Sequence, residues 1–352
     1  MRRLISEVIR SNGLRVHDFV FVLVIFTGLG GAAWAQTAAE PWVHQDAYIR
    51  KLVAQSRSNS ARLRSDFKSA LSDMPLSATQ RRVADRLNEI DIAIDETDMK
   101  FTGVGADIEN GRRKVIVPAG FLLAMDMVNR AAVEAAIFSV PQEKLRDYLI
   151  YAQGQLQRFR NSEGEGNAPQ NLQRFCRQAE LDCDSFDRTP VAAFYGSTLE
   201  AANMAGLAFV LGHEFAHHIL GHLTCSSIMR FKEEAAADLF GLRLALKSKR
   251  NPIYPAPGIG AYLVLFAAGR DTHLSPAEDD YPDPLCRYSQ SLRQAIVALD
   301  TDADFQGQLR QFNLTAMWQQ IKNYMPNFER YTGSCNFPAH ESSLDYICPA
   351  QP

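Results

Sequence analysis

The sequence lacks a strong charge of either sign. Its 37 Lys and Arg residues nearly balance its 40 Asp and Glu residues, for a formal net charge of -3 at pH 7. A nucleic-acid partner usually requires a marked positive charge, so none is expected. With 46% hydrophobic and 22% charged residues over 352 positions, and with no internal repeat or low-complexity tract, the chain has the composition of a globular protein.

Beyond its first 35 residues, the chain also lacks an apolar run long enough to cross a bilayer. Its longest runs, MAGLAFVLG (204–212) and GIGAYLVLFAAG (258–269), reach about a dozen residues, whereas a membrane-spanning helix needs roughly 20. We therefore expect both runs to be buried helices, and no membrane span in the mature protein.

The N-terminus has the pattern of an export signal. Four arginines precede the apolar run FVFVLVIFTGLGG, and Ala33 and Ala35 then supply the small residues of a signal-peptidase site. We expect residues 1–35 to be a cleaved signal peptide and the mature protein to be exported, to a bacterial periplasm first and to the medium as the other option. An uncleaved anchor is the alternative, because the charged region before the apolar run is long. No cysteine lies at the junction, which argues against a lipoprotein anchor.

The six cysteines all lie in the exported part, and none belongs to a CxxC pair. Cysteines in an oxidising compartment usually form disulfides, and the absence of close pairs argues against a second zinc site. Six cysteines allow 15 pairings, so the sequence leaves the connectivity open. Proximity favours Cys176 with Cys183, Cys335 with Cys348, and therefore Cys225 with Cys286.

The first part of the mature chain has a helical pattern. Apolar residues recur at three- and four-residue spacing over about residues 45–94, among many charges. Pro75 interrupts this pattern, and Ser77 or Thr79 can cap the helix that follows. We therefore expect a helical hairpin that leads into the main domain.

One β-hairpin is predicted after it. KFTGVGADI and RKVIVPAG flank Asn110 and Gly111, a pair that suits the positive φ angles of a tight hairpin turn. A hairpin alone is marginal, so it must pack on helices or further strands. After Pro118 the pattern is again helical, except for a polar stretch at 161–190 that we expect to be a surface excursion.

The segment LGHEFAHHILGH, residues 211–222, holds four of the eight histidines. On an α-helix, four residues turn through about 400°, so His213 and His217 lie within about 40° of each other and can bind one Zn²⁺. Glu214 lies about 60° from His217, within reach of a water molecule on the metal. Zinc lowers the pKa of that water to about 7 and the glutamate takes up its proton, which is the chemistry of the HExxH motif.

The other two histidines point away from this helix face. His218 lies about 140° from the first ligand, and His222 about 180° from it if the helix continues, although Gly221 can end the helix and bring His222 back. The reprolysin-like pattern HExxHxxGxxH is absent, because Leu220 and Leu223 stand at its glycine and histidine positions. We therefore expect His222 to support the ligands or to pack beside them.

A catalytic zinc needs a third protein ligand and an open fourth position. The segment KEEAAADLFG, residues 232–241, offers Glu234 and Asp238, which are four apart and share one helix face. One can bind zinc while the other accepts the N–H of a ligating histidine and fixes its tautomer. A solvated acidic helix start is the alternative, and the neighbouring HExxH motif makes it the weaker one.

Together, HEFAHHILGH and EAAAD resemble the M48 family of zinc metallopeptidases, whose pattern is HExxH followed by ExxAD. The resemblance implies one Zn²⁺ bound by His213, His217 and Glu234, with Glu214 as general base and Asp238 beside a ligating histidine. The interval between the two motifs is too short for the membrane-spanning segments that some family members insert there.

Two further segments match the family more loosely. RKVIVPAGFL is similar to the family's edge strand and following helix, along which an extended substrate would add a strand. YPDPLCR resembles an HPxxxxR stretch, with Pro282 and Arg287 in register but Tyr281 at the histidine position. A phenol can donate a hydrogen bond to an oxyanion. The resemblance therefore makes Tyr281 and Arg287 candidate catalytic residues, with packing as the alternative for Tyr281.

We predict a predominantly helical α+β protein with a zincin-like metallopeptidase core and a small hairpin or edge sheet. The expected parts are a signal peptide (1–35), an N-terminal helical segment (36–100), an M48-type peptidase domain (101–300, with an insertion at about 161–190) and a cysteine-bearing helical tail (301–352).

The predicted function is that of an exported zinc endopeptidase acting on extended or misfolded proteins, in envelope quality control. One alternative is a chaperone or assembly factor that grips clients on a peptidase-like fold with little cleavage, against which the intact Glu214 argues. The other is that the histidines are structural and bind no metal, which would make the two motifs a coincidence.

Overall fold

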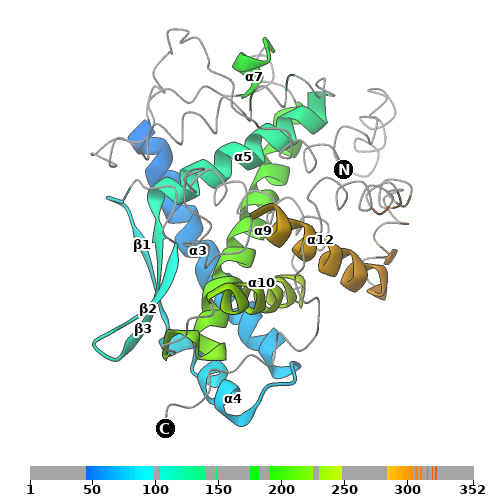
Figure 1. Cartoon of the computed structure of the whole chain (residues 1–352). Helices are drawn as coiled ribbons and strands as arrows, with labels where there is room; N and C mark the ends of the chain where they lie inside the picture. Colours follow the sequence, from blue (N-terminus) through cyan, green and yellow to red (C-terminus); the bar gives the residue numbers. More distant parts are fainter. Residues whose placement is uncertain are drawn as a thin grey trace, which may run out of the picture.

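A computed structural model (Figure 1) describes residues 45–98, 104–138, 175–181, 190–224, 230–247 and 284–303, with a few single positions besides. The predicted signal peptide, Tyr281, the apolar run at 258–269 and most of the predicted tail lie outside these residues. No helix within the described ranges combines the length and the apolar character that a bilayer span requires.

The described part is mostly helical with one three-stranded sheet, which confirms the predicted α+β class. In chain order, its elements are α3 (Gln45–Ser72), α4 (Ala78–Asp85), η2 (Leu87–Glu89), β1 (Asp91–Asp95), β2 (Gly105–Glu109), β3 (Arg112–Pro118), α5 (Ala119–Phe138), α7 (Phe175–Gln178), α9 (Pro190–Leu220), η3 (His222–Thr224), α10 (Arg230–Lys247) and α12 (Pro284–Asp300).

The break between α3 and α4 is closed by a capping box. The Ser77 hydroxyl accepts from the backbone N–H of Gln80 at 3.3 Å, and the Gln80 side chain accepts from the backbone N–H of Ser77 at 2.8 Å. Both bonds satisfy N–H groups that have no partner inside the helix. Of the two caps that the sequence offers, Ser77 is the one used.

The predicted helical pattern is wrong at its C-terminal end. Helix α4 ends at Asp85, and residues 91–95 form β1, which runs parallel to β3 with Ile92 opposite Val115. Ile90 and Ile94 are spaced as on a helix, but Ile92 and Ile94 also share one face of a strand. A short apolar run fits both periods, and here the pairing with β3 decides between them.

Strands β2 and β3 form the predicted hairpin. Glu109 pairs with Arg112, and Asn110 and Gly111 between them have φ angles of 51° and 76°, the positive values that a two-residue turn needs. The strand order is β1-β3-β2. The expectation that β3 is an edge strand is therefore wrong: β1, which the sequence patterns did not predict, pairs with its other side. Among the described strands, β1 and β2 lie at the edges.

Helix α9 is the central element of the core. It contacts α3, α5 and α10 as well as β2 and β3, and Figure 1 shows it running through the middle of the molecule. The run at 204–212 is largely buried, as predicted. On α9, Phe215 meets Phe67 of α3 edge to face, with ring centroids 6.0 Å apart. Buried residues of α3 and β1 belong to the same hydrophobic cluster as those of α9.

A buried polar network joins α3, α5 and α9 near the middle of α9. Asp126 of α5, 1% exposed, accepts hydrogen bonds from Tyr48 of α3 and, at 2.6 Å, from the Asn203 side chain of α9. Arg130 lies beside the same carboxylate, with its Nη2 3.3 Å from Asp126 Oδ2. Burial and the Asp126 charge raise the pKa of Tyr48, which stays a phenol. Such directional bonds hold the three helices in one arrangement.

The prediction that residues 161–190 form a surface loop is wrong at the short helix α7, which is partly buried. Phe175 and Cys176 are fully buried, with the Phe175 ring 4.9 Å from that of Tyr148 and the Cys176 N–H donating to Glu134 at 2.9 Å. Because most residues of this stretch are polar, its composition did not indicate that Phe175 and Cys176 are buried. Cys176 is disulfide-bonded, and no cysteine is free among the described residues. Each predicted cysteine pairing includes a residue outside them.

Replacing Ser77 by alanine should lower the free energy of unfolding by about 1 kcal/mol, because the start of α4 loses its cap. The matched control is Thr79→Ala, which should change the stability by less than about 0.5 kcal/mol. Chemical denaturation followed by circular dichroism measures both variants. Equal losses in the two would contradict the assignment of the cap to Ser77.

Candidate metal centre

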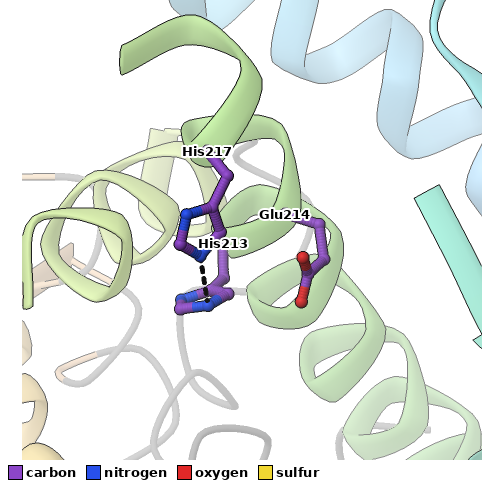
Figure 2. A group of neighbouring side chains, drawn as sticks. All are labelled: His213, Glu214 and His217. Atoms are coloured by element: carbon purple, nitrogen blue, oxygen red, sulfur yellow. Dashed lines mark hydrogen bonds between the residues drawn. The ribbon is translucent and has the colours of Figure 1, made fainter. Parts of the chain in front are cut away.

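Helix α9 presents His213 and His217 side by side, one turn apart. Both rings are buried, and their Nε2 atoms lie 3.1 Å apart. Figure 2 shows the two rings adjacent to each other, with the Glu214 carboxylate beside them on the same helix. Donor atoms of His213, Glu214 and His217 all lie within 4.8 Å of one another, which is close enough for one metal ion.

Helix α10 adds the carboxylate of Glu234. Its Oε2 lies 3.3 Å from His213 Nε2, and its Oε1 lies 3.5 Å from His217 Nε2. In a tetrahedral zinc site with bonds of roughly 2.0–2.1 Å, neighbouring donor atoms are about 3.3 Å apart. The two nitrogens, 3.1 Å apart, and the Glu234 carboxylate, with one oxygen 3.3 Å from the first nitrogen and the other 3.5 Å from the second, lie at separations close to this value. Glu234 is thus the candidate third donor.

Asp238, one turn further along α10, contacts the other nitrogen of His213. Its Oδ1 lies 2.9 Å from His213 Nδ1, and its side chain is 6% exposed. A carboxylate only accepts hydrogen bonds, so Nδ1 carries the proton and Nε2 keeps a lone pair for a metal ion. The two acidic residues thus have different positions: Glu234 faces the donor atoms, and Asp238 orients the ring behind them.

The surroundings of His213 favour positive charge. Burial lowers the pKa of this imidazole, but the hydrogen bonds and negative charges of Asp238 and Glu234 raise it to about 10. Two carboxylates around a buried ring attract a cation, either a proton or a metal ion. A metal ion has to displace this proton, so metal affinity should increase with pH.

His222 reaches the site through a change in backbone direction. Helix α9 ends at Leu220, and Gly221 has a φ angle of 82°, which glycine adopts without strain. The next turn, η3, places His222 Nδ1 3.0 Å from His217 Nδ1, and the His222 ring is buried. His222 therefore contacts His217 from behind, as Asp238 contacts His213.

Helices α9 and α10 touch through their backbones beside these residues. A Cβ atom on Gly212 would lie 2.8 Å from the carbonyl oxygen of Gly241, and one on Gly241 would lie 2.5 Å from the nitrogen of His213. Only glycine allows so close an approach. The sequence patterns did not mark these two glycines, because nothing in their spacing shows that they pair.

His218 lies on another side of α9. Its Nε2 is 3.0 Å from the carbonyl oxygen of Lys114 in β3, and Arg113 donates to the His218 carbonyl at 3.3 Å. Burial lowers the pKa of His218 to about 4, so the ring is neutral at pH 7. His218 connects the helix to the sheet and takes no part in the donor cluster.

Two of the predicted site residues are not placed beside the others. Tyr281 lies outside the described residues, and Arg287 belongs to α12, where only its backbone is described. The catalytic roles that the family resemblance implies for them stay predictions.

No known protein family, curated protein or solved structure matches this chain. The chemistry of the cluster therefore has to be inferred from its residues and their geometry.

Gly241→Ala should weaken zinc binding at least tenfold and cost roughly 1–3 kcal/mol of stability, because the added methyl group overlaps the backbone at His213 and separates α10 from α9. Competition with a chromophoric chelator measures the affinity. Gly105→Ala is the control, since its Cβ would meet nothing within 4 Å. Unchanged zinc affinity in Gly241→Ala would show that the helix contact does not position the donors.

Asp238→Asn should weaken zinc binding roughly 10–100-fold, because a neutral amide is a poorer acceptor for His213 Nδ1 and leaves Nε2 less basic. The same chelator competition measures the change, and Asp85→Asn, at an exposed carboxylate on α4, serves as the control. Equal affinities of the two variants would exclude the orienting role of Asp238.

Proposed function

We propose that this chain is an exported, zinc-dependent endopeptidase with a zincin-like core, which hydrolyses peptide bonds of protein substrates. The main support is the convergence of His213 Nε2, His217 Nε2 and the Glu234 carboxylate at separations of 3.1–3.5 Å. Glu214 stands beside these three donors without being one of them.

This donor set fits zinc. Two imidazole nitrogens and one carboxylate are typical of catalytic zinc sites, which leave one position for water. Magnesium and calcium prefer oxygen donors throughout. When bound, zinc lowers the pKa of a water molecule to about 7 and polarises the substrate carbonyl.

We assign proton transfer to Glu214. Its carboxylate lies within 4.8 Å of the histidine donor atoms, and the residue is 3% exposed. From this position Glu214 accepts a proton from the attacking water as the oxygen bonds to the carbonyl carbon. It then gives the proton to the departing amine nitrogen as the C–N bond breaks.

Asp238 and His222 hold the two ligating rings, each through the nitrogen that faces away from the metal position. If either contact is lost, the histidine ring that it holds can rotate, although its nitrogen donor is still present. From the resemblance, Tyr281 would stabilise the oxyanion by a hydrogen bond, with Arg287 nearby.

Strand β2 offers a place for an extended substrate. It is an edge strand of the sheet that the described residues form, and it contacts both α9 and η3. An extended peptide can add a strand to such an edge. At present Asp107 accepts from the N–H of Ile108 at 2.7 Å, a local contact that protects an edge from unwanted pairing. A bound strand would replace it. Backbone recognition of this kind suits extended or misfolded proteins in the cell envelope.

Glu214→Gln should reduce hydrolysis of an unfolded test protein at least about 100-fold while zinc stays bound, because the donors remain and the proton acceptor is lost. Glu200→Gln, an exposed position on the same helix, is the matched control. Product formation is measured by mass spectrometry with and without chelator, and zinc by elemental analysis.

A wild-type protein that binds zinc but cleaves nothing would contradict the proposal. So would cleavage that persists in Glu214→Gln or in the presence of chelator. A biological activity that survives Glu214→Gln would instead favour the chaperone or assembly factor.

A further inference from the structure

His218 makes contacts that the metal centre does not account for. It follows His217 directly but points about 100° away around the helix, and it is fully buried. Its Nε2 lies 3.0 Å from the carbonyl oxygen of Lys114, and because a carbonyl only accepts, Nε2 carries the proton. An apolar side chain would fill this space without a directional bond, whereas a buried imidazole needs matched partners.

Arg113 completes the connection from the strand side. Its Nη1 donates to the backbone carbonyl of His218 at 3.3 Å and lies 3.5 Å from His218 Nδ1, which has the lone pair in this tautomer. The carbonyls of the last helical turn lack partners within the helix, and positive charge is favourable there. The helix thus donates a hydrogen bond to the strand, and the strand donates one to the helix, at the same point.

This contact sets where β2 lies relative to the metal centre. Lys114 of β3 pairs with Asp107 of β2 in the antiparallel register. Helix α9 is continuous from Pro190 to Leu220, so it carries His218 and Glu214 as one rigid unit. The bonds at His218 therefore determine the position of the sheet edge along the helix.

The position of that edge matters for an extended substrate. A strand advances about 3.4 Å per residue with side chains on alternate sides, so a shift along β2 would present a different bond to Glu214. A misplacement of about 1 Å can cost on the order of 100-fold in rate. Apolar packing alone would allow the sheet to slide along α9, whereas paired hydrogen bonds resist this movement.

We propose that His218, together with Arg113, is a positioning residue that fixes the register at which a substrate strand on β2 meets Glu214. The inference rests on the proposed endopeptidase function. His218 touches neither substrate nor metal in this role; it acts through β3 and β2.

Two variants of His218 distinguish the effect of its hydrogen bond from the effect of its side-chain volume. His218→Gln keeps an N–H at the position of Nε2, and His218→Leu keeps the volume but removes the donor. On one unfolded test protein, His218→Leu should lose at least about tenfold in kcat/KM and cut at additional bonds, while His218→Gln should stay within about threefold of wild type at the same bonds. Zinc content should be equal in all three proteins.

A readout besides activity is hydrogen exchange of the backbone amides at 105–117, which should become faster in His218→Leu and stay unchanged in His218→Gln. A purely structural role would reduce the amount of active protein without altering which bonds are cut. If His218→Leu does not fold, Arg113→Met provides the test, since it removes the second bond and keeps the aliphatic stem; its cleavage sites should shift in the same way.

The outcomes distinguish the two proposals. An active wild type with an identical cleavage pattern, kcat and KM in His218→Leu, or in Arg113→Met where that variant is needed, overturns the positioning role alone. A zinc-loaded wild type that cuts no peptide bond overturns the endopeptidase function and this inference with it.

Discussion

The direct backbone contact between α9 and α10 is the constraint on which the site depends. Gly212 and Gly241 let the helices approach until a single added carbon atom on either would overlap the other backbone. At that distance the short side chains of Glu234 and Asp238 reach both nitrogens of His213. A wider helix spacing would leave the carboxylates facing solvent and the histidines without a third donor.

The rest of the site is built around the orientation of two rings. Asp238 contacts His213 Nδ1 and His222 contacts His217 Nδ1, so both Nε2 atoms face the same point. Such outer contacts usually matter for metal affinity nearly as much as the donors themselves. Because the rings are buried, their hydrogen bonds and charges act in a medium that screens them weakly.

Helix α9 transmits this arrangement through the molecule. Near the middle of α9, the buried network of Asp126, Asn203 and Tyr48 joins it to α5 and α3. In its last turn His218 bonds it to β3, and Gly221 then ends the helix. The candidate metal centre lies on the stretch of helix between these two anchor points. A rigid helix held on both sides of the cluster suits a site whose donors must keep their separations within a few tenths of an ångström.

Local features of this protein could be predicted from its sequence because they depend on neighbours along the chain. Helical periodicity alone brings His213 and His217 together with Glu214 beside them, and turn chemistry alone predicts the hairpin at Asn110 and Gly111. Helical geometry left Glu234 and Asp238 interchangeable, and only the family resemblance gave them separate roles. Their distances to His213, the return of His222 and the central place of β3 depend on contacts between distant segments. Those were decided by the tertiary structure, because a sequence pattern gives the face of a helix or strand but not the distance or the neighbour that this face meets.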